Sequence, residues 1–163
     1  MKNIEIDRVK EFMNGLLCRD IFDGFLMAEA SIVSKSTMLL DGHITEDFLS
    51  DEELETLGLK KGGCIPYGQM RDICFSFIKG KHTPKSFRIV LLLDDKRINE
   101  LLSMDNFGMT PEDIGNLSLT IRFYEGRLAL MTGCTLKTFT LDKSLENCWD
   151  AYITNFLDRA GLI

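Results

Sequence analysis

Hydrophobic positions near the end of the chain recur at the spacing of a helix. A stripe of this kind predicts one apolar face of a long helix over residues 143–160. Asp142 or Ser144 can cap its start, and Gly161 stands where a helix stop is expected. We therefore expect the only tryptophan of the chain to pack in the core. The stripe consists of Leu145, Cys148, Trp149, Tyr152, Ile153, Phe156, Leu157 and Ala160.

Alternation of apolar and polar residues predicts strands before this helix. Residues 117–124 alternate strictly, and residues 127–131 return after a turn at Glu125-Gly126, which is typical of a β-hairpin. A further alternating run follows at 135–141, and the mostly apolar run at 87–93 indicates a buried strand. The remaining strands are expected at 4–6, 26–33, 37–40 and 43–49.

Apolar stripes and end signals predict three more helices, at 7–18, 67–79 and 95–104. The elements together predict an α+β fold with a mainly antiparallel sheet and a long C-terminal helix. One domain over residues 1–163 suits the length of the chain. Residues 2–49 and 87–141 can both be written as strand, helix and three strands, so two pseudo-repeated halves joined by a loop and helix at 50–80 are also predicted.

Charge is unevenly distributed along the chain, which has 19 Lys and Arg against 25 Asp and Glu. Residues 79–88 carry four positive charges and no negative one, so the rest of the chain has 15 Lys and Arg against 25 Asp and Glu. A basic patch on an acidic body can serve as a docking site for an anion. Gly80 and Pro84 can bend the loop so that its side chains converge. The predicted anion-binding residues are Lys79, Lys81, His82, Lys85 and Arg88.

Few residues suggest catalysis or metal binding. His43 and His82 are the only histidines, and the five cysteines are odd in number, widely spaced and without a C-x-x-C pair. His43 lies in a segment, residues 41–55, with seven acids and no Lys or Arg, and we interpret this segment as a solvated acidic loop. Cys64 and Cys134 neighbour glycines and are expected to be the accessible thiols. We assign no catalytic residue, no metal and no cofactor.

Membrane insertion and export are not indicated. No apolar run approaches the roughly 20 residues that a membrane helix requires. The N-terminal residues carry charges where a signal peptide has an apolar region. The expected compartment is the cytoplasm.

Two classes of function remain open at this point. The favoured one is a non-catalytic binding or scaffold protein whose basic loop, residues 79–88, contacts an anionic partner. That partner is a nucleic acid or an acidic protein surface, such as residues 41–55 of another copy in a homo-oligomer. The alternative is a small enzyme that acts on a phosphorylated substrate or uses an accessible cysteine. A deep cleft that joins a histidine to a cysteine or carboxylate would favour the enzyme, and a flat basic surface would favour binding.

Three segments resemble an uncharacterised bacterial family of unknown function. They are IKGKHTP at 78–84, FDGF at 22–25 and TFTLDKSL at 138–145. The resemblance spans nearly the whole chain and implies a small bacterial cytosolic protein, without an activity. The tandem arrangement of elements is also similar to the repeated half of DNA sliding clamps, which line their inner surface with basic helices. Here the first candidate inner helix carries Arg8, Lys10 and Arg19 against Asp7, Glu11 and Asp20.

Overall fold

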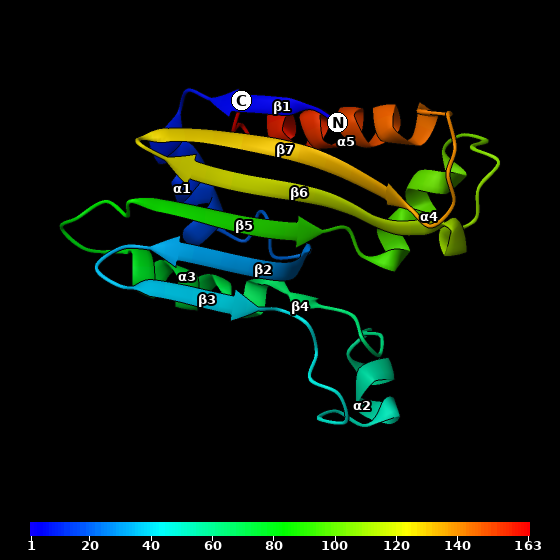
Figure 1. The fold of residues 1–163 in the computed structure, drawn as a ribbon, viewed down its shortest axis with the longest axis horizontal. Coiled ribbons are helices and arrows are strands. Elements are labelled where there is room, and N and C mark those ends of the chain that lie inside the picture. Colours follow the sequence, from blue (N-terminus) through cyan, green and yellow to red (C-terminus); the bar gives the residue numbers. More distant parts are fainter.

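The computed structural model describes residues 1–163 and contains one antiparallel sheet with helices behind it (Figure 1). The strand order is β1-β7-β6-β5-β2-β3, and the short β4 also pairs with β2. The predicted α+β fold with an antiparallel sheet is confirmed. The strands are β1 (Asn3–Ile6), β2 (Leu26–Val33), β3 (Thr37–Asp41), β4 (Ile65–Pro66), β5 (Ser86–Leu92), β6 (Ile114–Tyr124) and β7 (Arg127–Leu136).

The four predicted helices are all present, and a fifth was missed. Ser50 caps this fifth helix, α2, by accepting a hydrogen bond from the amide of Glu53, while the Glu53 side chain accepts one from the Ser50 amide. This capping box is a sequence signal that would have located the helix. The α-helices are α1 (Val9–Leu17), α2 (Asp51–Thr56), α3 (Arg71–Ile78), α4 (Asp95–Ser103) and α5 (Ser144–Arg159), and two short 3₁₀ helices span Tyr67–Gln69 and Pro111–Asp113.

The C-terminal helix is anchored in the core as its apolar stripe predicts. Trp149 and Leu157 have no exposed surface, and Phe156 is partly buried against the same core. The indole nitrogen of Trp149 donates a hydrogen bond of 3.0 Å to the carbonyl of Ser118 on β6. Gly161, at a φ of 69°, follows the helix end. The stripe therefore holds α5 against the sheet.

Two predicted strands are wrong. Residues 43–49 form no strand beyond a single bridge between His43 and Cys64. The run at 135–141 is not separate, because β7 continues through Gly133 and ends at Leu136. A β-carbon at Gly133 would lie 2.5 Å from the Ser118 Oγ on β6, so this glycine permits a close approach between strands and does not mark a turn.

The strand order contradicts the predicted repeat. In the first segment, β1 and β2 are separated by β7, β6 and β5, whereas in the second segment β5, β6 and β7 are neighbours. Helix α1 therefore carries the chain from one side of the sheet to the other, while α4 connects adjacent antiparallel strands. The architectural likeness to sliding clamps rested on this repeat and has no support without it.

The predicted β6–β7 hairpin is confirmed. Glu125 and Gly126 have φ angles of 50° and 79°. Two consecutive positive φ angles are typical of a type I′ turn, whose twist matches that of the flanking strands.

None of the helices combines the length and the apolar character needed to cross a membrane.

Candidate anion-binding site

In the structure the basic loop comprises residues 79–85, because Ser86 begins β5, and it is tied to the protein at both ends. Its first amide, on Lys79, donates to the Phe75 carbonyl at 2.8 Å and ends α3. Its last amide, on Lys85, donates to the Val33 carbonyl of β2 at 2.8 Å. Gly80 adopts a φ of 142°, which favours glycine. The loop therefore has a defined position beside the turn between β2 and β3.

A cavity of about 350 Å³ lies between the basic loop and the β2–β3 turn. Three lysines and a histidine line it without any acidic residue, and none of these lysines forms an ion pair with the protein. The Lys79 ammonium lies 5.8 Å from the centre of the Phe75 ring. We call this space the basic cavity. Its lining residues are Ser34, Lys35, Ser36, Phe77, Lys79, Gly80, Lys81 and His82.

The structure brings together three of the five predicted residues, Lys79, Lys81 and His82. Lys85 is exposed but does not line the basic cavity. Arg88 lies within β5, where its side chain forms an ion pair with Glu29 of β2.

Lys35 belongs to the basic cavity and was missed. The sequence marks it as a turn residue between two serines. It reaches the basic loop because β2 and β5 pair in a register that sets Val33 opposite Ser86. Such a register follows from the packing of the whole sheet, so local sequence patterns do not reveal it.

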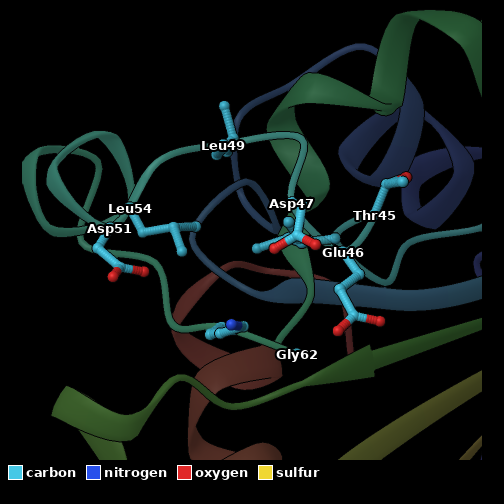
Figure 2. A pocket seen from close by; sticks show the side chains of 9 residues that line it. Thr45, Glu46, Asp47, Leu49, Asp51, Leu54 and Gly62 are labelled. Carbon is cyan, nitrogen blue, oxygen red and sulfur yellow. The ribbon is translucent and has the colours of Figure 1, made fainter.

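An acidic cavity of about 350 Å³ lies beside α2. Figure 1 shows α2 on the side of the fold away from the turn between β2 and β3, beside which the basic loop lies. Figure 2 shows the carboxylates of Glu46 and Asp47 from the preceding loop and that of Asp51 from α2 around this space. The carboxylates do not form a group that could hold a metal ion. The acidic segment is therefore placed where it does not neutralise the basic loop of the same molecule.

The cysteine prediction is wrong for Cys64. This thiol is 4% exposed, while Cys18 is the exposed cysteine and Cys134 is partly buried. The glycine-rich context suggested an open loop, but Cys64 pairs with His43 in a β-bridge. Burial, and to a smaller extent the charge of Asp41, raise the pKa of the Cys64 thiol.

Cys64 and His43 do not form an activated cysteine–histidine pair at this bridge. The His43 Nδ1 lies 2.7 Å from the Asp41 Oδ1, so the ring is oriented by a carboxylate. The backbone amide of His43, followed by its side chain, lowers the pKa of Asp41. An activated pair would also require that the His43 ring contacts the Cys64 thiol and that this thiol ionises readily. The raised pKa of Cys64 favours the protonated, unreactive form.

Comparison with known protein families identifies one match, to the family of unknown function DUF5721, over residues 15–162. The chain belongs to this family. The DUF5721 match includes the β2–β3 turn and the basic loop, so both walls of the basic cavity lie within it. It confirms the resemblance to a family of unknown function and carries no activity. No curated protein and no solved structure matched the chain.

Thiol labelling of this DUF5721 chain should follow burial. We expect iodoacetamide to modify Cys18 first and Cys74 last, because Cys18 is exposed and burial raises the pKa of Cys74 to about 11. Peptide mass spectrometry after timed labelling near neutral pH measures the order. In denaturant the difference should disappear. Labelling of Cys64 as fast as Cys18 in the folded protein would contradict the buried position of Cys64.

Proposed function

We propose that the chain is a non-catalytic binding protein that holds phosphate groups of an anionic partner in the basic cavity. One observation carries this proposal: three lysines, a histidine and two serines line a space without a carboxylate, in a chain of net charge −6. The proposed compartment is the cytoplasm, because the odd number and wide spacing of the cysteines do not suggest a disulfide framework.

The chemistry of the basic cavity suits phosphate. Lysine ammonium groups bind phosphate as compact point charges, and hydrogen bonds to charged groups are stronger than neutral ones. Ser34 and Ser36 add hydroxyl donors from the β2–β3 turn. Because Lys35, Lys79 and Lys81 have no ionic partner in the protein, an incoming anion does not have to displace a carboxylate from them.

The enzyme alternative receives less support. The basic cavity contains no cysteine or carboxylate that could act beside His82. Of the two thiols that the enzyme alternative relied on, Cys64 is buried and Cys134 is partly buried, and burial raises the pKa of both. A binding role needs neither an activated nucleophile nor a general base, so it suits these side chains better.

The test uses inorganic pyrophosphate as the probe and amide chemical shifts as the readout. We expect shifts concentrated at residues 34–36 and 79–82. The double variant Lys79→Gln, Lys81→Gln should weaken binding at least about tenfold, because it removes two charge-assisted contacts. The binding should also weaken as salt is added.

The matched control removes two exposed charges elsewhere, with Lys10→Gln and Arg19→Gln around α1. This control should bind pyrophosphate as the wild type does. An equal loss in the control, or shifts spread evenly over the protein, would show that the basic cavity is not a site. Salt-sensitive dimers that form without pyrophosphate and dissociate in the Lys79→Gln, Lys81→Gln variant would instead identify the acidic segment of a second copy as the partner.

A further inference from the structure

One face of the sheet is free of helices and carries three arginines. Figure 1 shows α1, α3 and α5 behind the strands, which leaves the front face open. Side chains alternate between the faces along each strand, so the neighbours of buried Phe87, Ile121 and Leu128 point outward. We call this surface the arginine face. Its arginines are Arg88 on β5, Arg122 on β6 and Arg127 on β7.

The register concentrates positive charge at the end of the arginine face. Arg88 lies directly opposite Arg122, and like charges in this position destabilise a pair of strands. Arg88 is balanced by Glu29. Arg122 and Arg127 are exposed and have no ion pair within the protein. Their guanidinium groups are therefore free to bind an external anion.

A cavity of about 460 Å³ opens among these arginines. Ser31 and Ser86 contribute hydroxyl groups to it, and Glu5 is the only carboxylate among its lining residues. Tyr124, opposite Arg127 in the hairpin, also lines it and is 57% exposed. An exposed aromatic ring beside unpaired guanidinium groups suits a ligand that has both phosphate groups and planar rings.

The arginine face lies close to the basic cavity. Ser34 lines the basic cavity, and Ser31 and Ser86 line the cavity on the arginine face. Between the two cavities run the end of β2 at Val33 and the start of β5, joined by the hydrogen bond from the Lys85 amide to the Val33 carbonyl. Only a strand end therefore separates two sites that suit phosphate.

We infer that the anionic partner is a single-stranded nucleic acid that runs from the basic cavity onto the arginine face, an inference that rests on the proposed function. Successive phosphates bind the lysines and then Arg122 and Arg127. Each planar guanidinium group can bind two oxygens of one phosphate. A base stacks on the Tyr124 ring. Single strands are favoured over duplexes because only unpaired bases offer their flat faces to an aromatic side chain on a sheet.

The test measures fluorescence anisotropy of a labelled single strand of about 12 nucleotides, a length within the usual site sizes of such proteins. The variant Arg122→Gln, Arg127→Gln should weaken binding at least about tenfold and reduce the slope of log affinity against log salt by about 1.4. Tyr124→Ala should weaken binding about tenfold with an unchanged slope, because it removes stacking and no charge. Lys10→Gln, Arg19→Gln serves as the charge-matched control.

Pyrophosphate binding separates this inference from the proposed function. If the pyrophosphate shifts at residues 79–82 persist but the single strand does not bind, this inference is wrong and the proposed function stands. If neither probe binds, both are wrong. A duplex or a mononucleotide that binds as tightly as the single strand overturns the inference. The inference is also overturned if the Arg122→Gln, Arg127→Gln variant binds the single-stranded nucleic acid as tightly as the wild type, provided that its circular dichroism shows a folded protein.

Discussion

Replacing Trp149 with alanine is expected to lower the free energy of unfolding by about 3–5 kcal/mol. The side chain has no exposed surface, and its ring stacks on that of Tyr152 with centroids 5.4 Å apart. The substitution leaves a cavity between α5 and the sheet and removes the donor to the Ser118 carbonyl. Urea denaturation followed by circular dichroism measures the loss, since Trp149 is the only tryptophan and its variants lose that fluorescence signal.

Two controls separate packing from hydrogen bonding. Trp149→Phe retains an aromatic ring but removes the indole donor to the Ser118 carbonyl and part of the buried volume, so it should cost about 1–3 kcal/mol. Phe139→Ala removes a ring that is 91% exposed and should change stability by less than about 0.5 kcal/mol. The packing argument fails if Trp149→Ala costs no more than Phe139→Ala.

Gly42→Ala is expected to destabilise the protein by about 2–3 kcal/mol. A β-carbon at this position would lie 1.7 Å from the carbonyl oxygen of Met27 and 2.7 Å from its carbonyl carbon. Both are backbone atoms of β2, so the clash can be relieved only by moving the strand. The Gly42 amide donates to the Ala28 carbonyl at 2.9 Å, and its own carbonyl accepts from the Ile65 amide at 3.0 Å. The junction of β3 and β4 with β2 depends on this glycine.

Urea denaturation of Gly42→Ala, with Gly24→Ala as the matched control, tests this expectation. A β-carbon at Gly24 would lie 2.4 Å from a guanidinium nitrogen of Arg97, the far end of a flexible side chain that can move away. The control should therefore lose much less stability than Gly42→Ala. Equal stability of the two variants would mean that β2 yields at Met27 and that the close approach is not required.

The basic cavity could be predicted from the sequence only in part. The cluster of four positive charges in residues 79–88 drew attention to the loop, and Lys79, Lys81 and His82 do share one cavity. Arg88 could not be assigned to another surface from its position in the sequence. It is the third residue of β5, after Ser86 and the buried Phe87, and its partner Glu29 is 59 residues away. Contacts at such separation depend on which strands become neighbours.

The arginine face was visible in the sequence as a pattern but not as a site. The alternation of residues 117–124 puts Arg122 and Tyr124 on the polar side of a strand, and the Glu125-Gly126 turn brings Arg127 opposite Tyr124. That Arg88 lies beside Arg122 follows only from the pairing of β5 with β6. A single arginine on a polar strand face is ordinary, whereas three on neighbouring strands form a charged surface.

Secondary structure and fold class followed from residue patterns because each depends on neighbours within a few positions. Apolar spacing located α1, α3, α4 and α5, and alternation with a Glu-Gly turn located the longest hairpin. Strand order, the continuation of β7 through Gly133 and the burial of Cys64 depended on the packed sheet. The reason is physical, because hydrophobic burial and strand pairing act between residues far apart in the chain. Many strand registers satisfy the same local pattern, and only the packing of a single core selects one of them.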